Sequence, residues 1–208
     1  MDASATQVWF APALALLLGY LAGSIPFGLL IARWGGAGDI RSIGSGNIGA
    51  TNVLRTGRKG LAALTLLLDA LKATAAILLV GAFRPDLMLA TAVMAFLGHL
   101  YPVWLRFRGG KGVATLAGVA VALHPWSGLV YAAVWIAAMG ITRYSSVGGM
   151  TAAIALPVAA ALFGRFDLVL VYIGFALVVL WKHRVNVDRL LSGTEPRIGR
   201  STPEPIVE

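Results

Sequence analysis

The stretch GVATLAGVAVALHPWSGLVYAAVWIAAMGIT, residues 112–142, contains no Asp, Glu, Lys or Arg. An apolar run longer than about 17 residues can cross a bilayer as a helix. As one straight helix this run would rise about 46 Å, which exceeds a hydrocarbon core of about 30 Å. His124-Pro125 is a turn signal near its middle, because proline disfavours helix at the residue before it. We therefore expect a short helix over 112–123, either tilted or re-entrant, and a return over 125–142.

Similar apolar runs lie on both sides of this stretch. The chain is 58% hydrophobic and 12% charged, about half the charged share of a soluble domain. Most of it must therefore face lipid or other apolar helices, and no polar stretch is long enough for a second domain. We predict one all-α, polytopic membrane domain over 1–208, with a flexible tail from about 197 to 208. The remaining predicted spans are 8–34, 61–83, 87–107 (broken late by Pro102), 147–163 (containing Pro157) and 166–181.

Basic residues decide the orientation, because cytoplasmic segments carry an excess of Lys and Arg. With the N-terminus outside and 112–142 crossing twice, 14 of the 17 Lys and Arg residues lie inside, and only Arg84 and Arg165 lie outside. A single span there would place five C-terminal cations outside. We predict seven transmembrane helices, short extracytoplasmic turns and a cytoplasmic C-terminus; five spans plus a re-entrant pair is the alternative. The net charge of +8 then reflects membrane orientation, and no nucleic-acid partner is expected.

All the longer polar segments fall on the cytoplasmic face: 35–60, 106–111 and 182–199. An enzyme or binding protein of the inner surface is typical of this distribution, whereas a pore is not. The chain has no N-terminal basic region and no cleavable signal peptide is expected. It also contains no cysteine, which excludes disulfides, thiolate nucleophiles and Cys-ligated metals. We expect neither a metal site nor a cofactor.

The stretch GSGNIGATNVLR, residues 44–55, is the most informative polar segment. Its glycines permit tight turns and close approach to a ligand, and backbone N–H groups before a helix form a phosphate cradle. Arginine adds a planar fork that binds phosphate through two hydrogen bonds. The simpler interpretation is a flexible, capped turn. The predicted phosphate-binding residues are Gly44, Ser45, Gly46, Asn47, Gly49, Thr51, Asn52 and Arg55.

This stretch also matches G-x-G-x-x-G, with Asp69 twenty residues after Gly49. We reject a dinucleotide site because that fingerprint needs a preceding strand, and a membrane helix precedes this loop. A P-loop is rejected as well, because Ala50 occupies the position of its lysine.

A second glycine-rich loop, residues 109–112, places Lys111 between Gly110 and Gly112 just before the short helix. A helix N-terminus is unfavourable for a cation, so this placement favours a bound anion beside Lys111. All three residues are predicted to bind phosphate; an ordinary positive-inside lysine is the alternative.

The third polar segment, residues 182–193, is expected to continue the last helix out of the membrane. His183, Asn186 and Leu190 would then share one face. His183 and Asp188 match H-x-x-x-x-D, but residues five apart on a helix point about 140° away from each other. A His–Asp dyad is therefore not expected unless the helix breaks there.

Ionisable residues lie well within two of the predicted spans: Asp69 and Lys72 in 61–83, and His99 in 87–107. Asp69 and Lys72 are three residues apart on one face, so we expect an ion pair that faces the other helices. His99 is interpreted as a histidine satisfied by helix packing.

Several segments resemble one family when read in chain order. They are 23–28 (GSIPFG), 44–52 with Arg55, 98–102 (GHLYP) with 109–112 (GGKG), and His183, Asn186, Arg189-Leu190 and 193–195 (GTE). Together they are similar to the bacterial acyl-phosphate-dependent glycerol-3-phosphate acyltransferases, over nearly the whole chain from about Leu14 to Gly199.

The resemblance implies a seven-helix enzyme of the bacterial cytoplasmic membrane with its motifs on the cytoplasmic side. Its members transfer a fatty acyl group from acyl phosphate to the 1-hydroxyl of glycerol 3-phosphate, giving lysophosphatidic acid in the first step of phospholipid biosynthesis. The implied partners are both substrates, membrane lipid and the soluble phosphate acyltransferase that makes acyl phosphate. The implied catalytic residues are Ser45, Arg55, Lys111, His183 and Asn186.

Two positions depart from the family pattern. Val185 stands where a glutamate is usual, and Ala73 stands where a glycine is usual. For the chemistry we expect direct attack by the glycerol hydroxyl, with either a substrate phosphate oxygen or His183 as proton acceptor. A transporter would instead need polar groups near the bilayer midplane, where only Asp69 and Lys72 qualify. An alcohol phosphatidyltransferase would need paired aspartates, and the sequence has no D-x-x-D.

Overall fold

The computed structural model describes residues 3–199, and every regular element within them is helical. The elements are α1 (Ala3–Ser24), α2 (Phe27–Trp34), η1 (Ile40–Ser42), α3 (Ala50–Leu54), α4 (Lys59–Gly81), η2 (Pro85–Leu87), α5 (Met88–Leu100), η3 (Val103–Leu105), α6 (Val113–Leu123), α7 (Pro125–Thr142), α8 (Ser145–Leu162), α9 (Phe166–Lys182) and α10 (Arg184–Leu191). The chain divides into two compact units, Met1–Gly128 and Leu129–Glu208. The single domain over 1–208 stays a prediction.

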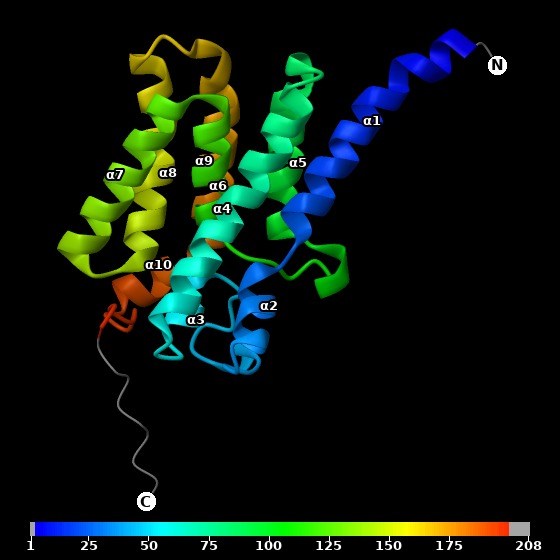
Figure 1. Ribbon diagram of the computed structural model, residues 1–208. Helices are drawn as coiled ribbons and strands as arrows, with labels where there is room; N and C mark the ends of the chain where they lie inside the picture. Colours follow the sequence, from blue (N-terminus) through cyan, green and yellow to red (C-terminus); the bar gives the residue numbers. More distant parts are fainter. Residues whose placement is uncertain (1–2, 200–208) are drawn as a thin grey trace, which may run out of the picture. The chain divides into compact units, whose positions relative to one another are not determined.

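In the first unit, α4 packs against α1, α2, α3, α5 and α6, and α1 also packs along α5 (Figure 1). Small residues allow these backbones to approach closely, as is usual between membrane helices. A Cβ atom on Gly23 of α1 would collide with the carbonyl of Ala95 on α5. A Cβ atom on Gly118 of α6 would likewise collide with the carbonyl of Ala70 on α4. The glycines therefore set the spacing of the helices that carry the polar loops.

The first predicted span, 8–34, is broken at Ile25-Pro26 into the two helices α1 and α2. Proline removes a backbone donor and so frees carbonyl groups that a bilayer cannot satisfy. Side chains from elsewhere in the unit bind two of these carbonyls. The Trp104 Nε1–H donates to Ser24 O at 2.7 Å, and the Lys72 ammonium donates to Ile25 O at 2.7 Å. These two hydrogen bonds from distant residues stabilise the break between α1 and α2.

The expected turn at His124-Pro125 is confirmed, because α6 ends at Leu123 and α7 begins at Pro125. His124 has extended backbone angles of φ −157° and ψ 99°. Its ring also contacts the Ser127 hydroxyl, with Nδ1 and Oγ 2.8 Å apart. As predicted, α6 is short: its 11 residues rise about 16 Å, roughly half of a hydrocarbon core.

In the second unit, α8 packs along α9, and Gly148 of α8 lies close to Trp135 and Met139 of α7. The expectation that the last helix continues through residues 182–193 is wrong. α9 ends at Lys182, α10 begins at Arg184, and the two are bent by 56°. The bend falls where the apolar sequence of α9 gives way to the polar sequence of α10. Residues 183–195 then form hydrogen bonds with one another, such as those from Asn186 and Arg189 to Glu195.

Five helical segments are long and apolar enough to cross a membrane, and the bent pair α9–α10 makes a sixth. They are Trp9–Trp34, Lys59–Gly81, Pro85–Leu105, Pro125–Thr142 and Ser145–Leu162. Their outward side chains are apolar, for example Leu79 at 58% and Leu170 of α9 at 81% exposure. The chain is therefore an all-helical, multi-pass membrane protein. The count of seven stays a prediction, because it depends on the short α6.

The flexible tail was predicted to begin at about residue 197. Residues 200–208 lie outside the described residues. Arg197 lies over the Tyr144 ring and donates from Nε to its hydroxyl at 3.0 Å, and the Ile198 N–H donates to Arg143 O at 2.8 Å. The segment up to Gly199 is therefore held against the start of α8.

Candidate active site

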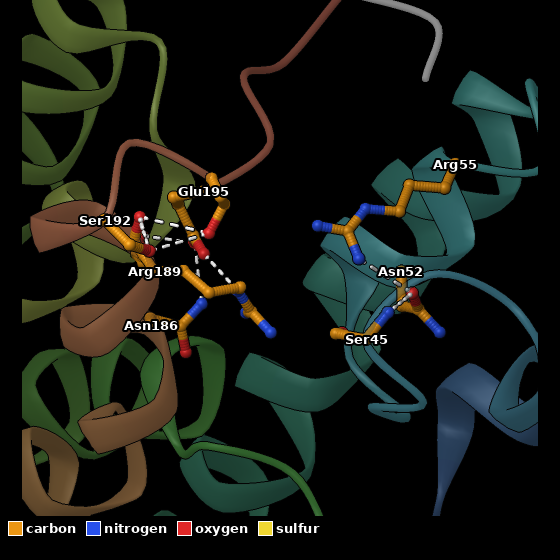
Figure 2. A network of polar contacts seen from close by, with 9 residues as sticks. Ser45, Asn52, Arg55, Asn186, Arg189, Ser192 and Glu195 are labelled. Carbon is orange, nitrogen blue, oxygen red and sulfur yellow. Dashed lines mark hydrogen bonds and ion pairs between the residues drawn. The ribbon is translucent and has the colours of Figure 1, made fainter. Parts of the chain in front are cut away.

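Asn52 organises the first glycine-rich loop of unit one. Its side chain is buried, and its Nδ2 donates to Ile40 O at 2.6 Å. Its Oδ1 accepts two hydrogen bonds, from the Ser45 N–H and from Arg55 Nη1, both at 3.3 Å. Figure 2 shows the bonds from Ser45 and Arg55 meeting at this amide. One amide thus fixes both residues, which were predicted to be catalytic, in addition to its predicted role as a donor to phosphate.

Two glycines are required by the backbone of this loop. Gly44 and Gly46 have φ of +55° and +67°, in the left-handed region that favours glycine. A Cβ atom on Gly44 would also lie 2.6 Å from Arg55 Nη1 and 2.8 Å from Asn52 Oδ1. Gly44 therefore leaves the space in which the guanidinium meets Asn52. Ser45 between them is exposed, Arg55 is half-buried, and the short helix α3 begins after Gly49.

The second loop folds back on the end of α5. The Gly109 N–H donates to Leu100 O at 3.1 Å, and the Gly110 N–H donates to His99 O at 3.0 Å. Gly112 then adopts φ +88° as the residue before α6. Lys111 lies half-buried between these fixed points. The predicted placement of Lys111 at the N-terminus of the short helix is confirmed. Only Gly112 separates Lys111 from the first residue of α6, Val113.

The predicted ion pair between Asp69 and Lys72 is confirmed. Lys72 Nζ lies 2.6 Å from Asp69 Oδ1, and the two side chains are only 2% and 3% exposed. His99 also belongs to this cluster, because its Nδ1 lies 3.0 Å from Lys72 Nζ. The histidine therefore has a polar partner on α4, in addition to packing between helices as expected.

In unit two, His183 stands at the bend between α9 and α10 and is 3% exposed. Its Nδ1 lies 2.8 Å from Val179 O. A carbonyl oxygen only accepts, so Nδ1 carries the hydrogen, and the neutral ring has its lone pair on Nε2. The helix does break at the histidine, but Asp188 is exposed whereas His183 is buried. The geometry therefore favours a ring oriented by the backbone over a His–Asp dyad.

Glu195 is the centre of a hydrogen-bond network that was not predicted from the sequence (Figure 2). Its Oε1 accepts from Ser146 Oγ at 2.7 Å and from Asn186 Nδ2 at 2.6 Å, and its Oε2 accepts from Arg189 Nε at 2.7 Å. Burial acts to raise the pKa of Glu195, but the bonds from Ser146, Arg189 and Asn186 outweigh it and hold the pKa below its usual value. A charged Glu195 therefore orients the Asn186 amide.

The only sequence signal for Glu195 was its place in the GTE string at 193–195, and nothing in the sequence pointed to Ser146. The departure at Val185 does not disturb this network, because Val185 is 52% exposed whereas Asn186 is buried. Ala73 is fully buried within α4. Within residues 3–199, no group of three or more His, Asp or Glu side chains is arranged as a metal site would be.

The fold and these polar clusters define a class of protein: a multi-pass helical membrane protein whose polar and basic residues gather in glycine-rich loops and at a bent helix end. The family described as "Glycerol-3-phosphate acyltransferase" matches residues 13–193. The chain belongs to this family of acyltransferases of phospholipid biosynthesis.

Curated relatives and solved structures agree with this placement. The chain is 54% identical over 186 residues to a glycerol-3-phosphate acyltransferase of Mesorhizobium japonicum, covering 89% of this chain and 95% of the relative. It is 52% identical over 200 residues to the glycerol-3-phosphate acyltransferase of Sinorhizobium medicae, covering 96% of this chain and 98% of the relative. Its structure is similar to PlsY (YgiH), an integral membrane glycerol 3-phosphate acyltransferase, in the glycerol 3-phosphate form, with a TM-score of 0.84, 37% identity and coverage of 90% and 96%. For the lysophosphatidic acid form of PlsY the TM-score is 0.83 and the identity is 36%, with coverage of 90% of this chain and 95% of that chain.

Proposed function

We propose that this protein transfers a fatty acyl group from acyl phosphate to the 1-hydroxyl of glycerol 3-phosphate, releasing lysophosphatidic acid and phosphate. The observation that carries the proposal is the construction of the two glycine-rich loops. The first loop orients the Arg55 guanidinium through Asn52 Oδ1, and the second places Lys111 directly before the start of α6; cations and helix N-termini are the groups that bind phosphate esters. Both proposed substrates carry a phosphate, and the similar PlsY structures are described as glycerol 3-phosphate and lysophosphatidic acid forms.

The proposed reaction needs little covalent machinery. The glycerol hydroxyl oxygen attacks the acyl carbonyl carbon, the bond from that carbon to the phosphate oxygen breaks, and phosphate leaves with the electron pair. The hydroxyl proton passes to a phosphate oxygen or to His183, whose Nε2 carries the lone pair in the tautomer set by Val179 O. Rate enhancement then comes from positioning and charge stabilisation. We propose roles in this step for Ser45, Arg55, Lys111, His183 and Asn186.

The donor is tested with purified protein in detergent, supplied with glycerol 3-phosphate and either palmitoyl phosphate or palmitoyl-CoA, without added metal or nucleotide. We expect lysophosphatidic acid from palmitoyl phosphate only. Product from palmitoyl-CoA alone would overturn the donor assignment. Folded protein that makes no product from either donor would overturn the acyltransferase proposal and call for liposome transport assays of glycerol 3-phosphate. We also propose a transient contact between the cytoplasmic loops and the soluble phosphate acyltransferase that the family resemblance implies as the source of acyl phosphate.

The proposed orientation has seven segments, with the N-terminus outside and the loops at 35–60 and 106–111 in the cytoplasm. It rests on the distribution of Lys and Arg described above. The chain lacks cysteine, so in a single-cysteine variant the introduced residue is the only thiol of this protein that a maleimide can label. Phe83 is 79% exposed in the turn after α4, and Gly60 is exposed with nothing within 4 Å of an added Cβ.

We expect a membrane-impermeant maleimide to label the Phe83→Cys variant in intact cells. The Gly60→Cys variant should be labelled only after permeabilisation. The cysteine-free parent is the control in both states. The reverse pattern would invert the proposed topology.

A further inference from the structure

The ammonium group of Lys72 has three hydrogens, and three groups surround it. Asp69 Oδ1 lies at 2.6 Å, Ile25 O at 2.7 Å and His99 Nδ1 at 3.0 Å. The Lys72, Asp69 and His99 side chains are between 2% and 4% exposed. A carboxylate and a carbonyl oxygen both accept hydrogen bonds. The third hydrogen of Lys72 therefore points to the histidine ring.

This arrangement fixes the tautomer of His99. An ammonium group can only donate, so Nδ1 must accept, and the neutral ring carries its hydrogen on Nε2. A charged His99 bonded to Asp69 does not fit, because Nδ1 and Oδ1 are 3.7 Å apart, beyond hydrogen-bond range. The buried ion pair thus turns the far side of the ring into a donor.

That far side faces the Gly109–Gly112 loop. A Cβ atom on Gly110 would overlap His99 Nε2 and would lie 2.7 Å from Cε1 of the same ring. The backbone of His99 also holds the loop, since His99 O accepts from the Gly110 N–H at 3.0 Å. His99 therefore contacts Gly110 twice, through its backbone carbonyl and through its ring. Gly110 is the residue directly before Lys111.

We propose that His99 is a positioning residue for the Lys111 loop. The Nε2 edge of its ring packs against the loop at Gly110, and Asp69 and Lys72 act at a distance by holding the ring and setting its tautomer. The glycine at 110 admits the ring, and the ring in turn fixes where Lys111 is presented. The functional part of this inference rests on the proposed role of Lys111 in binding a substrate phosphate.

Two substitutions at His99 separate the two sides of the ring. The glutamine amide reaches about as far as Nε2, so His99→Gln keeps a donor toward the loop. The asparagine amide reaches only as far as Nδ1, so His99→Asn keeps an acceptor for Lys72 but no donor toward Gly110. Two readouts are needed: amide hydrogen exchange of the segment 106–112, and steady-state kcat and KM for glycerol 3-phosphate.

We expect His99→Asn to speed exchange of the Gly109 and Gly110 amides at least about tenfold and to raise KM about tenfold, with a smaller change in kcat. His99→Gln should stay within about threefold of wild type in both. Exchange that is equally slow in wild type and His99→Asn would overturn the proposal. Faster exchange with unchanged KM would leave His99 as the support of the loop but remove the proposed phosphate role of Lys111.

The loop side gives an independent test in case the His99 variants do not fold. Gly110→Ala would press a methyl group onto a ring that Lys72 holds in place, so it should reproduce the faster exchange and raised KM of His99→Asn. Gly60→Ala is the matched control, because its added Cβ meets nothing within 4 Å. A Gly110→Ala protein with wild-type exchange and KM would overturn the proposal as well.

Discussion

Replacing Arg55 with alanine should lower kcat/KM for glycerol 3-phosphate by a factor of roughly 10²–10³, the usual loss when one preorganised donor to a reacting anion is removed. Arg55 is half-buried, its guanidinium is oriented by Asn52 Oδ1 at 3.3 Å, and Gly44 leaves the space for it. Lys111→Ala should give a loss of similar size. Arg55→Lys should recover only part of the activity, because lysine keeps the charge but not the planar fork.

Arg58→Ala is the matched control for Arg55→Ala. Arg58 lies three residues away and is exposed, and its Nη1 donates to Gly35 O at 2.9 Å. Its loss removes the same charge from the same polar segment without touching the Asn52 amide, so activity should change less than threefold. Initial rates over a range of glycerol 3-phosphate concentrations, with thermal unfolding measured in parallel, separate the two cases. Equal losses in the Arg55 and Arg58 variants would mean that general surface charge, and not a specific site, attracts the substrate.

Replacing Lys72 with methionine should destabilise the protein by about 3–5 kcal/mol, because it leaves the buried Asp69 carboxylate without its partner. The same change removes the donor to Ile25 O at the break between α1 and α2. Asp69→Leu should also destabilise, through the unpaired ammonium. The double variant Asp69→Leu/Lys72→Met removes both charges, and it should be more stable than the Lys72 variant alone.

Denaturant midpoints in detergent measure this double-mutant cycle. The exposed pair Arg84–Asp86, with Nη2 and Oδ2 2.7 Å apart, is the control. Arg84→Ala should leave the midpoint nearly unchanged, because solvent screens an exposed ion pair. Additive effects of the Asp69 and Lys72 substitutions would contradict a coupled buried pair.

Local signals in the sequence predicted most of the fold. The turn at His124-Pro125, the short helix before it and the Asp69–Lys72 pair depend on residues at most a few positions apart, and all three are confirmed. The bend at His183 was missed, because helical spacing continues through it and the polar character of residues 182–193 alone does not break a helix. The break at Pro26 was missed because its freed carbonyls are bound by residues far along the chain.

The candidate site shows the same limit. Glycines and cations in the loops predict where anions bind, and this stays a prediction; the structure shows how Asn52 holds Ser45 and how the loop before Lys111 is bonded to the end of α5. The partner of Asn186 could not be deduced from helical spacing. Glu195 reaches it only after the chain turns beyond α10, and Ser146 joins from 49 residues earlier in sequence. Such contacts depend on tertiary packing, which carries no periodic signal.

The short α6 has a consequence for hydrophobic mismatch. A helix that faces lipid must match the thickness of the bilayer or deform it. On α6 only Val121 is exposed, at 43%, whereas Thr115, Leu116, Gly118, Val119, Ala120 and Ala122 are buried. Because most residues of α6 pack against protein, including α4 and α5, the length of α6 is set more by these neighbours than by the thickness of the bilayer.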